Sequence, residues 1–508
     1  MKLKTIMGVS AGFHDAGVSV INNQGDILFA GHSERYSKVK NDAELNQGLM
    51  QEALSFGQPD VVAWYERPWL KATRQLYSGE WRKIWTDKNP RQHLMPYMNY
   101  MLPYSPTLDA KAYDMIYTWP HHLSHAAAGF QTSPFDEAIV IVIDAIGEWD
   151  TWTAWHAYYN DKGRAKYKRI YTQRYPHSLG LFYSAMTKRC GLKPMEEEYI
   201  LMGMSAYGDK QSYHTVWDMA VDIDHKQTFK RNFHTGIEYE FGAEFGVESL
   251  ARATQNVTER MLGTFMKQLA FSKVGNTVQN CVFMGGVALN CLANSKLRDI
   301  WNQMWIMPNP GDCGSSLGAA ALSYKRKLNW QGPYLGTDIP GVYPSEQIIG
   351  ELQRTGICGV ASGRAEFGPR ALGNRSLLAD PRGEDIKDRV NEIKRRQKFR
   401  PFAPMILEEH AADYFHMEGD TSPYMQHTYR CRYPKRFPAI VHWDDTSRVQ
   451  TVGRNDQTGA RDLLEKWYVL TDCPMLLNTS LNIRGEPMVN DRADADRFEQ
   501  KYGVKVYS

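Results

Sequence analysis

Two histidines spaced four residues apart are the first residues in the sequence with an evident capacity for chemistry. The segment Pro120–Ala128 (PHHLSHAAA) is rich in alanine and lacks glycine, which predicts a helix. His121 and His125 then lie at positions i and i+4 on one face, close enough to bind one metal ion. The alternative interpretation is a capped helix that carries two surface histidines. A divalent metal needs further ligands, and carboxylates commonly supplement histidines.

Two aspartates in glycine-rich surroundings are candidates for those further ligands. Asp312 lies in the segment 309–318 (NPGDCGSSLG), just before an alanine-rich helix. It is either the capping residue of that helix or a third metal ligand. Asp144 ends the apolar segment 138–144 (AIVIVID), which predicts a buried strand. A carboxylate at a strand end beside glycine suits a metal that binds phosphate.

A second glycine turn and a histidine turn add two more candidate sites. Gly285-Gly286, followed by Asn290, form a turn between the short strand 282–284 and a helical segment. Uncovered backbone N–H groups in such a turn accept a phosphate or adenosine group, although a lone Gly-Gly turn is nonspecific. His14-Asp15 lie in the turn after the first predicted strand, residues 5–10. An imidazole titrates near neutral pH, so His14 is a candidate general base, and the alternative is a packed histidine at a hairpin.

The last third of the chain is marked by basic residues between rigid apolar turns. Phe367-Gly368-Pro369 and the segment 401–404 (PFAP) are such turns, and the segment 478–487 (NTSLNIRGEP) adds amide and hydroxyl donors. Guanidinium groups on turns suit a small oxyanion, because they donate two parallel hydrogen bonds to phosphate or carboxylate. A nucleic-acid or solvent-facing surface is the alternative. The basic residues are Arg364, Arg370, Arg375, Arg382, Lys394, Arg396 and Arg400.

The elements that must position these residues alternate between strands and helices, which predicts an α/β fold. Strands are predicted at 5–10, 18–21, 27–31 and 138–144, and a polar or glycine turn follows several of them. The aperiodic segment 331–344 is rich in Gly and Pro and predicts a linker. We therefore expect domains at 1–330 and 345–508. No internal sequence repeat is evident.

Composition sets wide limits on the class of protein. The chain has 508 residues, of which 43% are hydrophobic, and its formal net charge is +3. Seven cysteines without CxxC spacing argue against a disulfide framework and a thiolate zinc site. The N-terminus lacks the pattern of a secretory signal, and no run of about 18 apolar residues predicts a membrane span. We expect a cytoplasmic protein, either a monomer or a homodimer, without a membrane partner.

Taken together, seven segments between about residue 6 and about residue 490 resemble one family, the O-carbamoyltransferases of the nodulation, cephamycin and tobramycin type. The resemblance implies an N-terminal actin-like ATPase (ASKHA) domain and a C-terminal YrdC-like α/β domain. It also implies that ATP and carbamoyl phosphate are co-substrates, which form a carbamoyl-adenylate before transfer to a hydroxyl. The segments are HHLSHAAAGF, PHSLGLFYSA, GGVALNCLAN, FGPRALGNRSLLADPR, FRPFAP, RVQTV and NTSLNIRGEP.

The resemblance assigns roles to individual residues. It implies that Fe²⁺ or another divalent metal binds His121, His125 and Asp312, with Asp144 beside it, and Mg²⁺ is a further candidate cation. Lys40, Gly285, Gly286 and Asn290 match nucleotide-binding positions, while His14, beside Asp15, matches a residue near the acceptor hydroxyl. Ile200, Ala145 and Leu481 depart from the family's usual Lys, Gly and Phe. The carbamoyl-phosphate positions are Arg370, Arg375, Arg400, Arg448 and Asn482, with Lys394 and Arg396 as neighbours.

Three functions stay open at this point. The first is carbamoylation of a hydroxyl on a small molecule such as a sugar, an antibiotic or a nucleoside. The second is carbamoylation of a hydroxymethylated base in DNA, because residues 67–91 interleave aromatic and basic side chains. The ordinary alternative for that segment is a helix and a loop. The third function is a non-catalytic ATP-dependent switch on the same actin-like fold.

Overall fold

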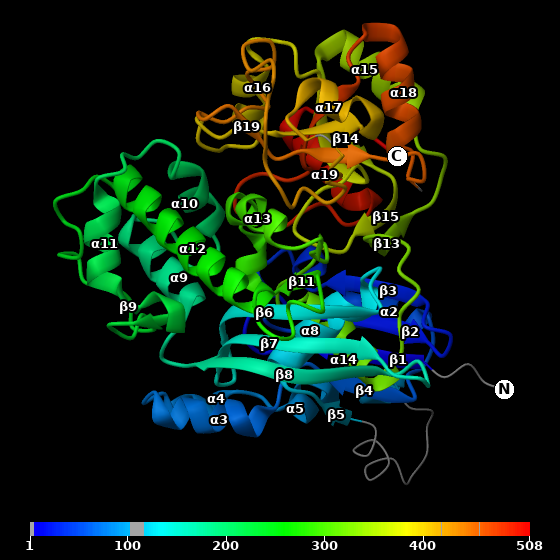
Figure 1. Ribbon diagram of the computed structural model, residues 1–508. Coiled ribbons are helices and arrows are strands. Elements are labelled where there is room, and N and C mark those ends of the chain that lie inside the picture. Colours follow the sequence, from blue (N-terminus) through cyan, green and yellow to red (C-terminus); the bar gives the residue numbers. More distant parts are fainter. Residues whose placement is uncertain (1–4, 102–115, 418, 457) are drawn as a thin grey trace. The chain divides into compact units, whose positions relative to one another are not determined.

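The computed structural model describes residues 5–101, 116–417, 419–456 and 458–508 (Figure 1). They fold into two compact units. The first unit contains the described residues up to Ser33 and those from Asn41 to Trp330. The second unit contains Glu34–Lys40 and the described residues from Gln331 to Ser508.

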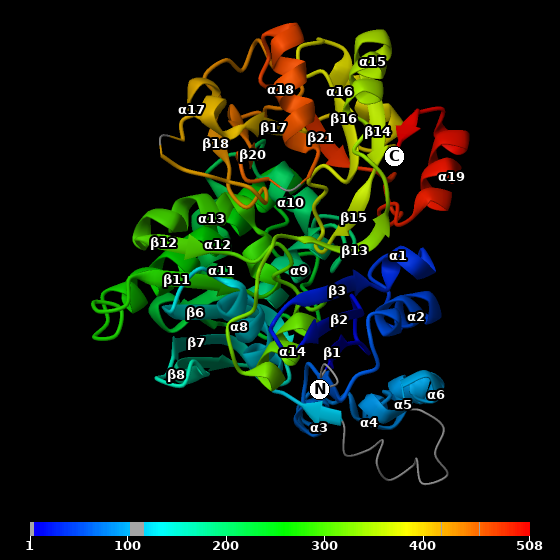
Figure 2. The same ribbon diagram turned by 90° about the vertical axis from the view of Figure 1, so that its right-hand side faces the viewer.

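A five-stranded mixed sheet begins the first unit. Its strand order is β3-β2-β1-β4-β5. β1, β2 and β3 pair antiparallel, and β4 and β5 continue the sheet from β1 in parallel. Figure 2 shows β1, β2 and β3 side by side. The strands are β1 (Thr5–Ser10), β2 (Gly17–Asn22), β3 (Ile27–His32), β4 (Val61–Trp64) and β5 (Ile116–Thr118).

A second five-stranded sheet in the same unit repeats that topology. Its order is β12-β11-β6-β7-β8, in which β6, β7 and β8 pair antiparallel and β11 and β12 continue in parallel from β6. Two such sheets in one unit define the actin-like fold, so the predicted fold of this unit is confirmed. The duplication leaves no repeat in the sequence. The strands are β6 (Glu137–Gly147), β7 (Asp150–Tyr159), β8 (Ala165–Arg174), β11 (Asn280–Met284) and β12 (Gln303–Trp305).

Two helices made largely of small residues pack against the sheets and against each other. α14 (Gly314–Tyr324) packs on β1, β2 and β4, while α8 (His121–Thr132) packs on β6 and β11. A Cβ atom on Gly318 of α14 would lie 1.8 Å from the carbonyl oxygen of Ser124 on α8. Glycine is therefore required there for the two backbones to approach each other.

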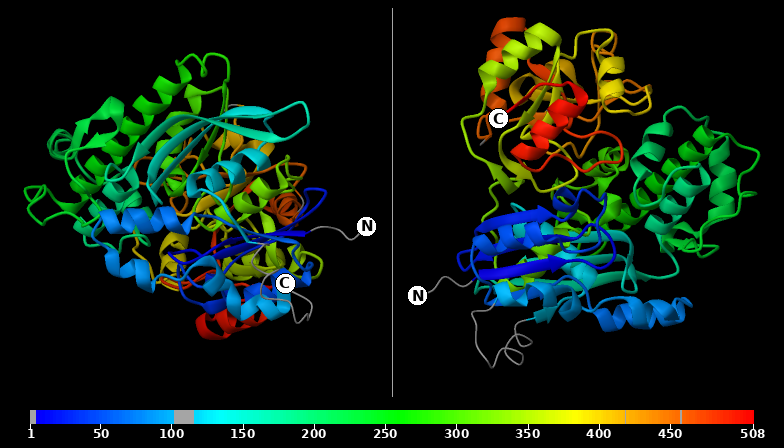
Figure 3. Two further views of the ribbon diagram at one scale, coloured as in Figure 1. Left: turned by 90° about the horizontal axis from the view of Figure 1, so that it is seen from below. Right: turned by 180° about the vertical axis from the view of Figure 1, so that it is seen from behind.

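Two groups of helices complete the first unit. Figure 3 shows the green helices of the insertion between β8 and β11 gathered on one side of this unit. They are α9 (Leu179–Arg189), α10 (Glu198–Met204), α11 (Ser212–Ala220) and α12 (Val247–Ala270), followed by α13 (Cys291–Leu297). The other group, around β4, consists of α2 (Gln47–Ser55), α3 (Pro68–Tyr77), α4 (Trp81–Thr86), α5 (Pro90–Leu94) and α6 (Met98–Met101).

The second unit is built on a six-stranded mixed sheet with the order β20-β17-β21-β16-β14-β22. Its side chains alternate between two apolar cores. Cys358 and Val360 of β14 face a core with α15 (Ser345–Thr355) and α18 (Ala460–Thr471), whereas Ile357 and Ala361 face the opposite core. The strands are β14 (Ile357–Ala361), β16 (Arg375–Ala379), β17 (Ala403–Leu407), β20 (Gln450–Val452), β21 (Met475–Ser480) and β22 (Val506–Tyr507).

The helices of this unit lie on both sides of its sheet, as an α/β fold requires. β13 (Tyr334–Ile339) and β15 (Gly363–Glu366) pair antiparallel in a separate two-stranded sheet. β13 lies within the segment 331–344 that the sequence suggests as a linker. The helices are α1 (Glu34–Ser37), α15 (Ser345–Thr355), α16 (Ile386–Ile393), α17 (Ala411–Tyr414), α18 (Ala460–Thr471) and α19 (Arg492–Tyr502). Among the described residues, none of the helices is both long and apolar enough to cross a membrane.

Candidate metal centre and anion site

The predicted metal ligands come together in the first unit. One ligand atom from each of His121, His125, Asp144 and Asp312 can be chosen so that all four lie within 4.8 Å of one another. The two Nε2 atoms of the histidines lie 3.0 Å apart. Asp312 Oδ1 lies 3.2 Å from His125 Nε2 and 3.4 Å from His121 Nε2. Asp144 Oδ2 lies 3.3 Å from His125 Nε2 and 3.4 Å from His121 Nε2.

The five distances given are close to those of a tetrahedral metal site. With metal–ligand bonds of about 2.1 Å, tetrahedral ligand atoms lie about 3.4 Å from one another. The Nδ1 atom of His125 contacts the carbonyl oxygen of Pro310 at 3.0 Å. An Nδ1–H that donates to this carbonyl leaves the lone pair of Nε2 directed at the cluster, which is the usual support for a metal-binding histidine. The donor set therefore fits a divalent cation.

The electrostatics of the cluster also favour a cation. Asp312 is only 4% exposed, and Asp144 is half-buried. Burial alone raises the pKa of Asp144, but His121 and His125 hold it well below its ordinary value. Burial lowers the pKa of His121, yet Asp312 and Asp144 raise it well above its ordinary value overall. A metal-bound imidazole is neutral, so with a cation in place the two carboxylates and two imidazoles carry a charge of −2, which one divalent cation balances.

Local sequence features explain why these four residues meet. α8 begins at His121, so both histidines lie in its first two turns, next to the end of β6 that carries Asp144. Gly147 permits this contact, because a Cβ atom there would lie 2.5 Å from His121 Cδ2. Asp312 lies two residues before α14, whose N-cap is Cys313, and α14 packs on α8. His122, the residue between the ligands in sequence, points elsewhere and contacts Thr153 Oγ1 at 2.9 Å.

His14 and Asp15 lie beside the cluster. His14 Nε2 is 3.6 Å from Asp312 Oδ2, and His14 Nδ1 is 3.1 Å from Asp15 Oδ2. Burial lowers the pKa of His14, but the carboxylates of Asp312 and Asp15 outweigh this and raise it to about 9. The side chain of His14 is 25% exposed. This histidine is therefore held by one carboxylate, adjoins another, and still reaches the surface.

The predicted nucleotide residues are divided between the two units. The N–H of Gly286 donates to Asp144 Oδ1 at 3.3 Å, which links this turn to the cluster. Gly285 has a φ of +90°, and a Cβ atom on it would lie 2.2 Å from the carbonyl oxygen of Ile143. Asn290 caps α13 and exchanges two amide hydrogen bonds with Gln255. Lys40 belongs to the second unit, where it forms an ion pair with Glu34 at 2.9 Å.

Part of the predicted anion site forms a cluster at the end of β21. Lys394 Nζ donates to Asn482 Oδ1 at 2.7 Å and to Ser480 Oγ at 3.0 Å. Burial, Arg396 and Arg400 together lower the pKa of Lys394 well below its ordinary value. Three cations therefore lie close enough to repel one another, an arrangement that a bound anion stabilises.

Three other predicted anion-binding residues, Arg370, Arg375 and Arg448, have environments that differ from that of Lys394. Arg375 is fully buried, and its guanidinium group donates to five backbone carbonyl oxygens. Burial lowers its pKa to about 10. Arg370 and Arg448 are half-buried, and the Nε atom of Arg448 has no hydrogen-bond partner among the described residues.

Two site features were missed at the level of sequence. Glu148 is buried, accepts hydrogen bonds from the N–H groups of Arg67 and His121, and has a pKa that burial raises to about 7. Its position in the glycine turn after Asp144 is the sequence feature that could have indicated it as a site residue. Glu148 also lines a cavity of about 430 Å³ with Arg67 and Trp149.

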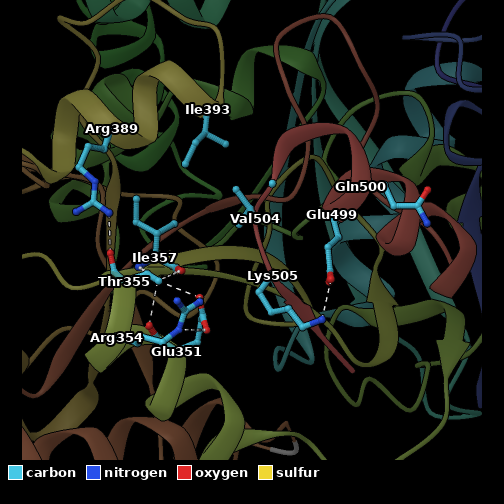
Figure 4. A pocket seen from close by; sticks show the side chains of 11 residues that line it. Glu351, Arg354, Thr355, Ile357, Arg389, Ile393, Glu499, Gln500, Val504 and Lys505 are labelled. Atoms are coloured by element: carbon cyan, nitrogen blue, oxygen red, sulfur yellow. Dashed lines mark hydrogen bonds and ion pairs between the residues drawn. The ribbon is translucent and has the colours of Figure 1, made fainter.

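A larger cavity, of about 640 Å³, lies in the second unit and includes none of the predicted site residues. Figure 4 shows two ion pairs among its charged side chains and Arg389 directed at Thr355, and Arg389 also pairs with Asp385 at 3.6 Å. Arg354 bonds Glu351 at 2.7 Å, and Lys505 bonds Glu499 at 2.7 Å. Because these charges are already balanced, the cavity offers no unpaired cation of its own to an anion, among the residues that line it.

An actin-like unit with a buried histidine–aspartate cluster, followed by a second α/β unit, defines the class of this protein. Residues 82–321 match the family model described as Carbamoyltransferase N-terminus, and residues 349–507 match Carbamoyltransferase C-terminus. The chain belongs to the carbamoyltransferase family and is an enzyme that transfers carbamoyl groups.

Three relatives match most of the chain. The chain is 31% identical to Uncharacterized protein sll1178 of Synechocystis sp., over 97% of this chain and 93% of that protein. It is 28% identical to Nodulation protein NolNO of Sinorhizobium fredii, over 95% of this chain and 76% of that protein. It is 30% identical to Nodulation protein U of the same species, over 72% of this chain and 73% of that protein.

Solved structures give only distant similarities. The activator of 2-hydroxyisocaproyl-CoA dehydratase from Clostridium difficile is 12% identical with a TM-score of 0.33, over 63% of this chain and 94% of that chain. HypF of T. kodakarensis is 12% identical with a TM-score of 0.38, over 64% of this chain and 48% of that chain. The fold assignment given above rests on the strand order of the two sheets instead.

Proposed function

We propose that this enzyme uses ATP and carbamoyl phosphate to make a carbamoyl-adenylate, from which it transfers the carbamoyl group to a hydroxyl. Hydrolysis of carbamoyl phosphate releases phosphate and carbamate, and the carbamate oxygen attacks the α-phosphate of ATP and displaces pyrophosphate. The observation that carries the proposal is the four-ligand cluster of His121, His125, Asp144 and Asp312, which adjoins the Gly285-Gly286 turn. The transfer domain is assigned to residues 1–330 and the carbamoyl-phosphate domain to residues 345–508. Fe²⁺ or another divalent ion, including Mg²⁺, suits the cluster.

In this proposal the metal supplies positive charge beside the adenylate phosphate. The chain's own residues carry the rest. Gly285 and Gly286 present backbone to the nucleotide without a side chain, and the Gly286 N–H already donates to Asp144. In the second unit, Lys394 and its neighbours Arg396 and Arg400 hold the anionic carbamoyl phosphate.

The transfer step needs a group that accepts the proton of the acceptor hydroxyl. The hydroxyl oxygen attacks the carbamoyl carbon, a new C–O bond forms, and the bond from that carbon to the adenylate oxygen breaks. AMP leaves with the electron pair. We assign the released proton to His14 Nε2, because Asp15 holds Nδ1 at 3.1 Å and Nε2 faces the cluster. A divalent cation on the cluster would offset the charge of Asp312 that raises the pKa of His14 to about 9, so that Nε2 is free to accept this proton. His14→Asn should lose turnover while its metal content stays normal, and normal turnover would remove this role.

The adenylation half of the reaction tests the proposal without knowledge of the acceptor. Incubation with ATP should release pyrophosphate only when carbamoyl phosphate is present. Lys394→Met should raise the KM for carbamoyl phosphate, because it removes the buried ammonium group that adjoins Asn482. The matched control is Lys398→Met, whose side chain is 64% exposed. ATP binding or hydrolysis that never depends on carbamoyl phosphate would instead identify a nucleotide-driven switch.

A further inference from the structure

Helices α3 and α4 of the first unit expose an unusual density of aromatic side chains. Trp69 is 62% exposed, Tyr77 69%, Trp81 56% and Trp85 84%. None of the residues of α4 is buried. Large indole rings that remain in water mark a surface that binds something, because contiguous exposed apolar area is costly. We call the segment 67–91, which contains both helices, the aromatic platform.

The aromatic platform is also strongly basic. Residues 67–91 contain seven Lys or Arg and only two Asp or Glu, a net charge of +5, whereas the whole chain carries +3. The guanidinium group of Arg82 lies 5.5 Å from the ring centre of Trp81. The side chain of Lys83 is 52% exposed and pairs with Glu80, and Lys71 and Lys88 pair with Glu66 and Glu44 outside the segment. Aromatic faces beside exposed cations complement a ligand that carries both planar rings and negative charge.

The cavity of about 430 Å³ is lined both by Leu70 of α3 and by Glu148, which contacts the backbone of a cluster residue. Trp149, which lines the cavity, donates from Nε1 to Thr73 Oγ1 of α3 at 3.0 Å, and its ring lies 5.3 Å from that of Tyr77. Glu148, on the same wall, accepts a hydrogen bond from the backbone N–H of His121. A ligand held on α3 and α4 can thus extend into a pocket next to the cluster.

The cavity has the lining that a single nucleotide needs. Arg67, Arg169 and Arg174 surround it, and Trp149 offers a ring for stacking. Arg169 and Arg174 pair with Asp150, whereas Arg67 has no ion-pair partner among the described residues. A volume of about 430 Å³ lies within the range of small-molecule sites. Enzymes that modify a base in a nucleic acid draw it out of the stack into such a pocket.

We propose that the acceptor is a hydroxyl-bearing base in a polynucleotide, which docks on the aromatic platform and places one unstacked nucleotide in this cavity. The proposal rests on the proposed function, because it identifies the acceptor of that reaction. Several exposed rings in series favour a chain of bases over a single sugar or antibiotic, which would fill the cavity and leave α4 unused.

The direct test measures binding of a fluorescein-labelled oligothymidine to the full-length protein by fluorescence anisotropy. Binding should weaken steeply between about 50 mM and about 200 mM salt, because phosphate contacts release counterions. The double variant Trp81→Ala/Trp85→Ala should bind at least about tenfold more weakly, since each stacked base is lost. Circular dichroism checks that this variant is folded, as its exposed positions predict.

Two control variants separate this surface from general effects. Phe271→Ala removes a ring that is 77% exposed at the end of α12, and it should leave binding unchanged. Lys162→Ala/Arg164→Ala removes two exposed cations at the β7–β8 turn, which lies about 30 Å along the hairpin from Trp149. This variant should also bind normally.

Three results would overturn the docking proposal. The first is the absence of any anisotropy change at low salt, and the second is an equal loss of binding in the control variants. The third is that Trp81→Ala/Trp85→Ala converts a dimer to a monomer in size-exclusion chromatography. The last result would make this face a contact between two copies of the chain. Pyrophosphate release needs no acceptor, so a protein that passes that assay and fails here refutes the docking alone.

Discussion

The strongest prediction concerns His125 and its neighbour His122. His125→Asn removes one of four ligand atoms, whereas His122→Asn changes an equally buried histidine that faces Thr153 instead of the cluster. Both variants lose the same chemical group from the same helix, α8. Any difference between them therefore reports the cluster and not the general cost of altering a buried imidazole.

The expected magnitude follows from binding linkage. Loss of even a supporting residue outside the ligand shell weakens metal binding about 10- to 100-fold, so loss of His125 should cost at least about 100-fold. A metal present at 100 times its Kd stabilises the folded protein by about 2.7 kcal/mol. After a 100-fold loss of affinity, the same concentration contributes only about 0.4 kcal/mol. The metal-induced rise in Tm should therefore shrink about sixfold.

The assay has two parts. Elemental analysis of the purified proteins should find about one divalent metal per chain in the wild type and in His122→Asn, and much less in His125→Asn. Thermal unfolding with and without added Fe²⁺ should then show the reduced stabilisation. Equal metal loss in both variants, or a wild type that neither contains metal nor responds to it, would refute the assignment of the cluster as a metal site.

Three further predictions concern stability. Gly285→Ala should lower the Tm, because the new Cβ atom would lie 2.2 Å from a backbone carbonyl oxygen. The control is Gly263→Ala within α12, where a Cβ atom meets nothing within 4 Å and should raise stability by up to about 1 kcal/mol. Thermal unfolding measures both effects. Arg375→Ala should lower the free energy of unfolding, measured in urea, by about 3–5 kcal/mol. Loss of the buried guanidinium group would leave five carbonyl oxygens without their hydrogen-bond donor. Arg461 lowers the pKa of Glu409 to about 2, below the ordinary 4.5. The stabilisation by this ion pair is therefore present above about pH 4.5 and lost as the pH falls towards 2, so the stability difference between wild type and Glu409→Gln should shrink over that range.

Local sequence patterns predicted most of the elements that hold the site. The strand expected at 5–10 is β1, and the alanine-rich segment after Pro120 forms α8 from His121 onward. These predictions succeed because a buried strand and a small-residue helix are encoded within a few adjacent residues. The spacing of His121 and His125 likewise fixed their common face before any tertiary contact was known.

Properties that arise only from tertiary contacts could not be predicted from local sequence patterns. Arg375 was grouped with other basic residues as an anion ligand, yet its guanidinium group contacts carbonyls contributed by segments as distant as Thr337 and Asn490. Lys40 lies in a short segment that belongs to the second unit although its neighbours in sequence belong to the first. Nothing in the sequence around either residue encodes these partners.

The duplicated topology explains why four ligands from distant parts of the sequence converge. After the last strand of the first sheet, β5, the chain enters α8, which supplies His121 and His125. After the last strand of the second sheet, β12, the chain continues towards α14, and Asp312 precedes that helix. The two ligand-bearing helix starts therefore occupy equivalent positions in the two repeats.

The turns that end the first strand of each repeat are equivalent in the same way. The turn after β1 carries His14, and the end of β6 carries Asp144. Each repeat thus contributes residues from two equivalent positions, the start of one helix and the end of one strand, to the same site. Since α8 and α14 pack against each other, the contact that joins the two repeats also brings the ligands together. A substitution that separates these helices, such as Gly318→Val, should therefore abolish metal binding without altering any ligand.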